Sequence, residues 1–266
     1  MTNLKGFAIV LTAVLSLAIV DINCNAQTAR PYQQMSAAER AHFVSKASKE
    51  IARRISDSEY QFTASFETEI QTALNEYAQR LSISNSATTN SHVIFERGQK
   101  HAPTIMTAFK ARGVSPLIGL YLPWIESEYV NETVSPGGGV GMFQFLPQTG
   151  QSLGLTTADL LNVATSADAA ARYLAKSMKS FEGDDNMKEV LAILSYNRGT
   201  NNVQTDLAQV SADRNLSCRI CKLTEQGGKT ESAQYVPRFF AAAILGENPQ
   251  AFGLTSPPLS SFGTGN

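Results

Sequence analysis

Polar and apolar residues follow each other along most of this chain with the three- and four-residue spacing of amphipathic helices. Ser36 followed by Glu39 has the spacing of a capping box and predicts a helix that runs to about Ile55. A second helix is predicted from Glu59 by a stripe of apolar residues, namely Phe62, Phe66, Ile70, Ala73, Tyr77 and Leu81. The sequence contains no long strand-like alternation and no internal repeat, so a mainly α fold is expected.

Prolines, glycines and polar stretches set the limits of the other predicted helices. Pro103 divides one helical region into two pieces, 92–99 and 103–112, after a polar loop at 82–91. The most apolar run, from Pro116 to Ile125, predicts a buried helix that Ser115 caps. Further helices are predicted at 147–155, 187–196, 201–210 and 235–245, the last of which ends before Gly246. Another predicted helix begins after a cap at Thr165 or Ser166. A turn is predicted at 183–185, an irregular segment at 211–232, and a disordered tail at 255–266.

The first 26 residues have the pattern of a secretory signal peptide. Lys5 precedes an apolar stretch at 6–20 that is short for a membrane span, and small residues suit cleavage after Ala26. Lipid attachment at Cys24 is the alternative, but the preceding Asp21-Ile22-Asn23 matches a lipoprotein signal poorly. We therefore expect an exported, periplasmic protein without an integral membrane span after cleavage.

Composition and cysteine content narrow the classes of function. The chain has 266 residues, a formal charge of −1 and 43% hydrophobic residues, which fits a globular protein and gives no electrostatic case for nucleic acid. Cys218 and Cys221 remain after cleavage, and in an oxidising compartment they form a disulfide or stay as two free thiols. The histidines are His42, His92 and His101, far from both cysteines in sequence, so neither a metal nor a cofactor is expected.

A carboxyl group stands at the end of the predicted buried helix. At 3.6 residues per turn, Gly119, Leu122 and Glu126 share one face of that helix, beside apolar neighbours. Burial disfavours the charged form of a carboxyl and raises its pKa, as a general acid near neutral pH requires. The simpler interpretation is that the helix returns to solvent at Glu126. The motifs that follow favour the catalytic interpretation.

Four motifs stand in order along the chain. They are Glu126-Ser127, then Ser135 ahead of Gly141-Met142-Phe143-Gln144, then Ser195-Tyr196-Asn197-Arg198-Gly199, and finally Tyr235-Val236-Pro237-Arg238-Phe239. Together they resemble the lytic transglycosylases of the soluble and membrane-bound D types, over roughly Val114 to Leu254. The resemblance implies a mainly α, lysozyme-like domain of the goose-type (SLT) class at 114–254, preceded by a helical N-terminal extension at 27–113. Met142-Phe143 and Ser195 depart from the family's more usual residues, which leaves the fine shape of the site open.

The resemblance also implies a role for each motif residue. Glu126 matches the catalytic acid, and Tyr235 matches a Tyr whose hydroxyl approaches that acid. Ser135 matches a Ser that orients the acetamido group or the reacting glycan, and Gln144 matches a Gln that lines the sugar site. Tyr196 and Asn197 match a pair that contacts substrate or supports the wall of the site.

The search for a second catalytic carboxylate decides between reaction types. Glu128 lies about 200° around the helix from Glu126, Glu132 belongs to no motif, and Asp184 and Asp185 fall in the predicted turn. A single carboxylate suits the resemblance, which implies cleavage of peptidoglycan glycan strands with formation of 1,6-anhydro-N-acetylmuramic acid. The alternatives are a lysozyme-type hydrolase, which ordinarily uses two carboxylates, and a non-catalytic cell-wall-binding scaffold. Secretion or cell-wall machinery is a candidate partner.

Overall fold

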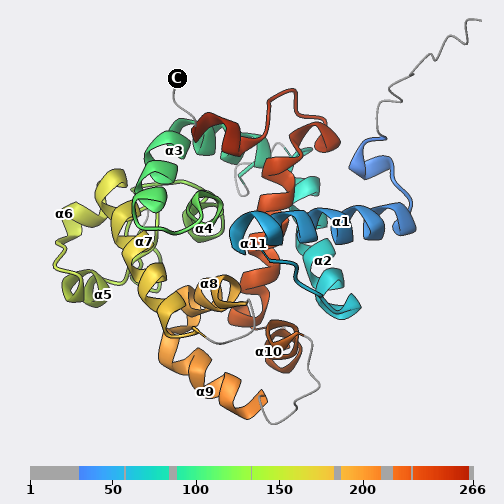
Figure 1. Ribbon diagram of the computed structural model, residues 1–266. Coiled ribbons are helices and arrows are strands. Elements are labelled where there is room, and N and C mark those ends of the chain that lie inside the picture. Colours follow the sequence, from blue (N-terminus) through green and yellow to red (C-terminus); the bar gives the residue numbers. More distant parts are fainter. Residues whose placement is uncertain are drawn as a thin grey trace, which may run out of the picture.

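The computed structural model describes residues 30–56, 58–83, 89–132, 134–182, 187–210, 218–228 and 230–263. Within these ranges the protein is helical and has no strand, only isolated bridges of Val140 with Val134 and with Phe145 (Figure 1). The predicted mainly α fold is therefore confirmed. The signal-peptide prediction at 1–26, with Cys24, and the predicted turn at 183–185 lie outside the described residues.

The helices are, in chain order, η1 (Tyr32–Gln34), α1 (Ala37–Ser56), α2 (Ala64–Arg80), α3 (Ser91–Ala111), α4 (Pro116–Ser127), α5 (Pro147–Ser152), α6 (Thr157–Leu160), α7 (Val163–Lys179), α8 (Lys188–Arg198), α9 (Thr200–Val210), α10 (Arg219–Gly227), α11 (Glu231–Glu247), η2 (Pro249–Phe252) and η3 (Leu259–Gly263). Among the described segments, no helix is long and apolar enough to cross a membrane.

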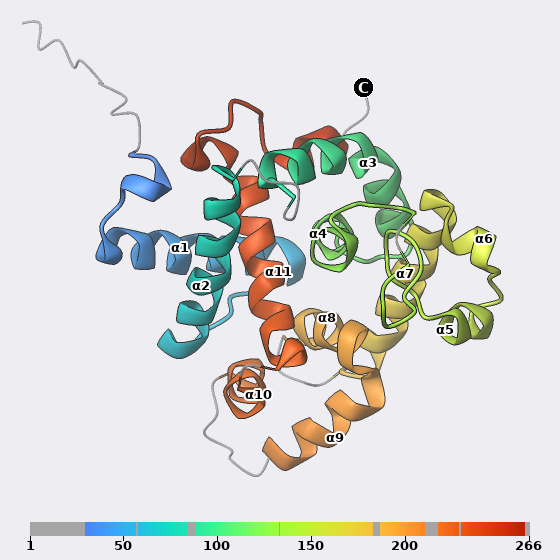
Figure 2. The same cartoon turned by 180° about the vertical axis from the view of Figure 1, so that it is seen from behind.

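Helix α11 runs through the middle of the molecule and packs against α2, α4, α8, α1 and α10 (Figures 1 and 2). Its sequence explains this position, because Phe239-Phe240-Ala241-Ala242-Ala243-Ile244-Leu245 is apolar on every face, and such a helix is buried all round. Every residue from Phe239 to Glu247 is buried. The helix therefore presents only its N-terminal part, with Tyr235, to a solvent-accessible site.

Helix α4 is the second buried element, as the sequence predicts. All residues from Leu117 to Trp124 are buried, and α4 packs closely on α3. A Cβ at Gly119 would lie 2.4 Å from the ring of Phe109, so only glycine permits this approach. Because the burial of α4 ends after Trp124, Glu126 is carried to the edge of the core.

The buried carboxylate of Glu247 links α11 to three other elements, α1, α4 and η3. Glu247, at the end of α11, accepts hydrogen bonds from the hydroxyl of Tyr121 on α4 and from Arg54 on α1, the latter at 2.6 Å. It also accepts from the backbone N–H of Ser260 at 3.1 Å and from its hydroxyl at 2.6 Å. A buried carboxylate needs such partners. The N-terminal helices thus share one core with α4 and α11.

Several predicted helix limits are confirmed and others are wrong. Ser36 and Glu39 form the predicted capping box at α1. Helix α2 begins at Ala64 rather than Glu59, since the side chain of Thr63 caps its N-terminus. The predicted break at Pro103 is absent, because α3 continues through it with Ala102 and Ile105 fully buried. Packing on both sides of the proline maintains the helix despite the missing N–H.

The C-terminal half of the chain is more ordered than the sequence predicts. Asn162, rather than Thr165 or Ser166, caps α7. The segment expected to be irregular contains helix α10, and α11 begins at Glu231 and passes through Gly246. The tail prediction is wrong for 255–263, where η3 packs on α3 and Leu259 is fully buried. Residues 264–266 lie outside the described part of the chain.

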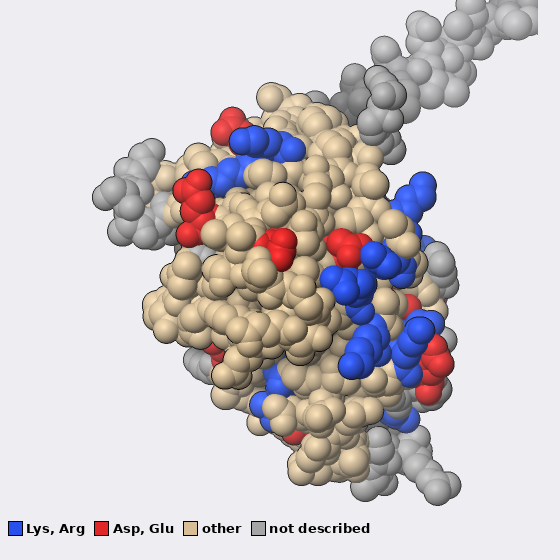
Figure 3. Space-filling view, turned by 90° about the vertical axis from the view of Figure 1, so that its left-hand side faces the viewer, with Lys and Arg blue, Asp and Glu red and all other residues tan. Residues whose placement is uncertain are grey.

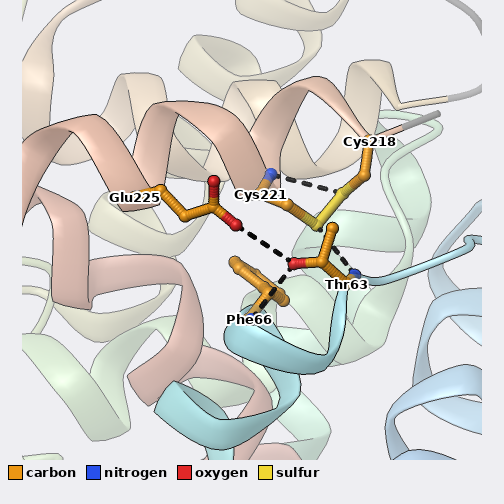
Figure 4. The surroundings of a disulfide bond; sticks show 5 residues. All are labelled: Thr63, Phe66, Cys218, Cys221 and Glu225. Atoms are coloured by element: carbon orange, nitrogen blue, oxygen red, sulfur yellow. Dashed lines mark hydrogen bonds between the residues drawn. A yellow bond between two sulfur atoms is a disulfide. The ribbon is translucent and has the colours of Figure 1, made fainter. Parts of the chain in front are cut away.

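Cys218 and Cys221 form a disulfide at the start of α10 (Figure 4). The sulfur of Cys221 accepts the backbone N–H of Thr63 at 3.4 Å, and that of Cys218 accepts the N–H of Cys221 at 3.2 Å. Both cysteines are buried. The bridge therefore braces α10 against the start of α2, and its burial argues against a catalytic redox role, which needs an accessible sulfur.

Candidate active site

All six residues that the motifs single out line one cleft of about 400 Å³. The cleft lies where the end of α4, the loop between α4 and α5, the end of α8 and the start of α11 meet. The motif residues in its wall are Glu126, Ser135, Gln144, Tyr196, Asn197 and Tyr235. Side chains as much as 109 positions apart in sequence are thus brought to one solvent-accessible space.

Glu126 occupies the last turn of α4, with its side chain partly buried at the cleft. Burial raises the pKa of its carboxyl to about 7, and a hydrogen bond from Tyr235 opposes that rise. The negative charge of Glu231 raises the pKa further, and the positive charge of Arg238 lowers it. Near neutral pH, Glu126 is therefore present in both its protonated and its ionised form.

Tyr235 donates its hydroxyl to Oε1 of Glu126. The Tyr is buried on α11, and burial together with the charge of Glu126 holds its own pKa well above the usual value. It therefore stays protonated and acts as a hydrogen-bond donor. A donor stabilises the ionised carboxylate more than the neutral acid, which is why this contact lowers the pKa of Glu126.

The glycine-rich loop places Ser135 in the cleft wall. The backbone N–H of Ser135 donates to the carbonyl of Gly139 at 2.9 Å, and the N–H of Gly138 donates to the carbonyl of Ser135 at 2.8 Å. The hydroxyl oxygen of Ser135 accepts the N–H of Gly139 at 3.0 Å. The loop, which can be followed between α4 and α5 in Figure 2, is thus closed by its own backbone. Among the described residues no acceptor takes the hydroxyl hydrogen of Ser135, so a ligand can accept it.

Gln144 reaches the cleft from a left-handed backbone conformation, with φ of 50°. Its side-chain amide donates to the carbonyl of Gly141 at 2.9 Å. Gly141 itself has a φ of 72°, and a Cβ there would lie 2.3 Å from the carbonyl oxygen of Leu160. The hydroxyl of Ser127 donates to the carbonyl of Met142 at 2.7 Å and ties this turn to α4. The second residue of the Glu-Ser pair therefore supports the loop.

Tyr196 and Asn197 form the wall contributed by the end of α8. The hydroxyl of Tyr196 donates to the carbonyl of Phe143 at 2.9 Å, so it fastens α8 to the loop. The charge of Glu126 and burial both hold the pKa of Tyr196 well above its usual value. The side-chain oxygen of Asn197 accepts the hydroxyl of Ser232 at 2.7 Å, across to α11. Both residues thus hold the cleft together while they line it.

Three polar cleft residues fall outside the predicted motifs: Glu231, Thr149 and Tyr173. Helical spacing could have found Glu231, since Glu231, Tyr235 and Arg238 are related as i, i+4 and i+7 on α11 and so share a face. Tyr173 comes from α7, and its ring packs edge-to-face on Tyr196 with centroids 5.5 Å apart. No sequence signal pointed to it.

The carboxylates considered from the sequence lie elsewhere. Glu128 ends α4 in a left-handed conformation and pairs with Arg80 on α2, away from the cleft. Glu132 is exposed and does not line the cleft, and Asp184 and Asp185 lie outside the described residues. Glu231 is therefore the second carboxylate of the cleft, at a position that the sequence search passed over. In the described ranges, no three His, Cys, Asp or Glu side chains are grouped to hold a metal ion.

Comparison with known proteins places this geometry in context. Residues 103–216 match the family model described as Transglycosylase SLT domain. The match begins within α3 and ends before α10, so it contains Glu126, Ser135, Gln144, Tyr196 and Asn197. Tyr235, Glu231 and Arg238 lie beyond it.

Two curated relatives are similar to parts of the chain. The peptidoglycan transglycosylase gp16 of Escherichia phage T7 is 37% identical over 97 residues, which are 35% of this chain and 7% of the phage protein. The membrane-bound lytic murein transglycosylase D of Escherichia coli (strain K12) is 26% identical over 170 residues, 62% of this chain and 36% of the relative. The chain thus spans well under half the length of either relative.

Proposed function

We propose, since residues 103–216 match the Transglycosylase SLT domain model, that the protein cleaves the bond between N-acetylmuramic acid and N-acetylglucosamine in peptidoglycan strands by lytic transglycosylation. The observation that carries the proposal is Glu126, which has a pKa of about 7 and shares one cleft with the five other motif residues. A group that first gives and then takes a proton works best when its pKa lies near the working pH. Glu126 meets that requirement.

In the first step, protonated Glu126 gives its proton to the bridging oxygen as the bond to the muramoyl anomeric carbon breaks. The N-acetylglucosamine side leaves as an alcohol, and positive charge develops on the anomeric carbon. In the second step, ionised Glu126 removes the proton of the muramoyl 6-hydroxyl while its oxygen bonds to the anomeric carbon. The product is a 1,6-anhydro sugar, no water enters, and Glu126 ends protonated.

The other cleft residues support this cycle. Tyr235 and Arg238 stabilise the ionised form of Glu126 between the two steps. The hydroxyl oxygen of Ser135 accepts from Gly139, and its hydrogen, which has no acceptor among the described residues, can be donated to the oxygen of a sugar acetamido group. Gln144 and Asn197 offer amide groups to the sugar hydroxyls. In this mechanism the acetamido oxygen of the substrate itself stabilises the charged anomeric carbon.

One observation favours a second candidate, a lysozyme-type hydrolase. Glu231 gives the cleft a second carboxylate, and a hydrolase uses such a group as base or nucleophile. The change Glu231→Gln separates the two reactions. For the transglycosylase, this variant continues to produce anhydro sugars; for the hydrolase, formation of reducing ends is lost.

The proposed activity is tested with Glu126→Gln and the matched control Glu132→Gln, which alters an exposed carboxylate outside the cleft. We expect Glu126→Gln to lose about 10²–10⁴-fold or more of the turnover of purified peptidoglycan, the usual contribution of an acid–base group. Glu132→Gln should match the wild type. Turnover by Glu126→Gln within a few-fold of wild type would refute the assignment of the acid.

We also propose export to the periplasm, where the substrate lies. The signal-peptide pattern at 1–26 supports this placement, and so does the similarity to a membrane-bound lytic murein transglycosylase. Cell fractionation with N-terminal sequencing tests it. A mature chain that begins at Gln27 is expected, and an uncleaved cytoplasmic chain would refute it.

A further inference from the structure

A second hollow adjoins the glycan cleft on the far side of Tyr173. It has a volume of about 580 Å³ and lies between α5, α7 and the start of α9. Its walls include Arg172, Tyr173, Lys176, Ser177, Thr200 and Asn201, and we call it the α7–α9 hollow. Gly199, the last residue of the third motif, also lines it, but no step of the proposed reaction uses it.

The α7–α9 hollow differs from the glycan cleft in charge. Its walls contain the cations Arg172 and Lys176 and, among the described residues, no carboxylate, whereas the glycan cleft contains Glu126, Glu231 and a single Arg238. Figure 3, which looks onto the side of the molecule that carries α5, α6 and α7, shows the largest group of Lys and Arg side chains along one side of this face, with Asp and Glu side chains beside some of them. A neutral ligand would not need cationic side chains in the wall of the hollow.

The two cations are not neutralised by their surroundings. Arg172 contacts Asp168 at 3.1 Å, but the same carboxylate also binds Arg112 at 2.6 Å, so two guanidinium groups share one negative charge. Lys176 is exposed, and within the part of the chain that the structure describes its ammonium group has no ion pair. The hollow therefore carries net positive charge, which attracts an anion.

Tyr173 links the hollow to the glycan cleft, because it lines both. Its hydroxyl donates to the carbonyl of Ser195 at 3.2 Å, and its ring packs on Tyr196, a wall residue of the glycan cleft. These contacts fix the Tyr as a shared wall. A ligand held beside Tyr196 can extend past Tyr173 into the hollow.

We propose that the α7–α9 hollow binds a carboxylate of the stem peptide that branches from the glycan strand, with Lys176 as the principal contact. The proposal rests on the proposed function, since it takes the strand in the adjoining cleft to be peptidoglycan. The sugars of the intact strand are N-acetylated and carry no charge, because the lactyl carboxyl of each muramoyl sugar is bound to the stem peptide as an amide. The stem peptides themselves carry free carboxylates. Hydroxyl and amide groups of Ser177, Thr200 and Asn201 complete a site that suits a peptide.

The test compares Lys176→Glu with Lys179→Glu. Lys179 is also exposed and follows Lys176 by about one turn of α7, but it does not line the hollow. Each variant and the wild type are assayed for kcat/KM on peptide-bearing strands and on the same strands after an amidase has removed the stem peptides. Binding of the free tetrapeptide stem to each protein is measured separately by calorimetry.

On peptide-bearing strands we expect Lys176→Glu to lose about tenfold in kcat/KM, through KM, because one charge-assisted hydrogen bond is replaced by repulsion. On denuded strands, where the amidase leaves a lactyl carboxylate on the sugar itself and no peptide carboxylate, its loss should be much smaller, and Lys179→Glu should match the wild type on both. An equal loss of kcat/KM on both kinds of strand, or no loss on either, would refute the proposal that the hollow binds a stem-peptide carboxylate.

If the wild type cleaves neither strand, the proposed function fails, and calorimetry alone decides the site. Tetrapeptide binding that Lys176→Glu weakens and Lys179→Glu does not supports the site, and absence of binding to the wild type overturns it.

Discussion

The hydroxyl of Tyr235 on α11 donates a hydrogen bond to Oε1 of Glu126 at the end of α4. The contact joins the fourth motif to the first and opposes the effect of burial on the pKa of Glu126. Burial is the larger influence, so the pKa remains raised, at about 7. Burial and the hydrogen bond from Tyr235 act in opposite directions and together place the pKa of the Glu126 carboxyl near 7.

Removal of the Tyr235 hydroxyl should raise the pKa of Glu126 further, because the hydroxyl stabilises the ionised form. Free enzyme needs Glu126 protonated to begin the reaction, so kcat/KM falls as pH rises through this pKa. In Tyr235→Phe the alkaline limb of the pH profile is therefore expected at higher pH. A limb that stays in place or moves to lower pH would show that the contact does not tune the acid.

Glu126 should also make the stability of the protein depend on pH. Its pKa is about 7 in the folded protein against an ordinary value of 4.5, so the folded state binds the proton more tightly. Stability is then greatest below about pH 4.5 and is lost as pH rises toward 7. Glutamine stays neutral, so at pH 8 Glu126→Gln should be more stable than wild type by about 1–3 kcal/mol in free energy of unfolding.

Urea denaturation at pH 4.5 and pH 8 measures this difference, with Glu132→Gln as the control for loss of an exposed carboxylate. The gain should be seen at pH 8 and should vanish at pH 4.5. An equal gain at both pH values would mean that ionisation of Glu126 is not its cause.

Glu247 should be the carboxylate most important for stability. Glu247→Ala leaves the buried hydroxyl of Tyr121 without its acceptor and removes the contacts of Arg54 and Ser260. We expect a loss of about 2–4 kcal/mol in free energy of unfolding. The matched variant Glu50→Ala removes an exposed ion pair with Arg53 and should cost under about 1 kcal/mol. Similar losses in the two variants would refute the role of the buried network.

The disulfide should contribute to stability and not to catalysis. Cys218 and Cys221 close a very short loop, for which chain-entropy reasoning gives about 2 kcal/mol, and neither residue lines the glycan cleft. The double change to Ser is expected to lower the melting temperature slightly and leave cleavage of peptidoglycan intact. Loss of activity upon mild reduction would contradict this account.

Much of the site was predictable because each motif carries its own residue types at fixed spacing. The order of Glu126, Ser135, Gln144, Tyr196-Asn197 and Tyr235 pointed to one cleft, which the structure shows. Arg238 belongs to the fourth motif, whereas Glu231 precedes that motif and reaches the cleft only because it shares a helix face with Tyr235. Tyr173 stands on α7 without a motif, and only tertiary packing brings it to Tyr196.

The fold errors have a common physical origin, which is that packing outweighs local signals. The stripe of Ile94, Phe95, Ala102, Ile105 and Phe109 passes straight through Pro103, and its burial keeps α3 continuous. Helix α10 is short and largely polar, and the disulfide and Thr63 hold it in place. In the tail, Leu259 is fully buried and Phe262 packs against the core, and these two residues anchor a segment that is otherwise rich in Ser and Pro.

The identity of the cleavage product tests the central claim most directly. Purified peptidoglycan is digested with wild-type protein in water enriched in oxygen-18, and the muropeptides are analysed by mass spectrometry, with Glu126→Gln as the blank. The account predicts muramoyl ends in the 1,6-anhydro form, one water lighter than reducing ends and free of the label. Reducing ends that carry the label would contradict it, and would indicate a hydrolase in which Glu231 activates water.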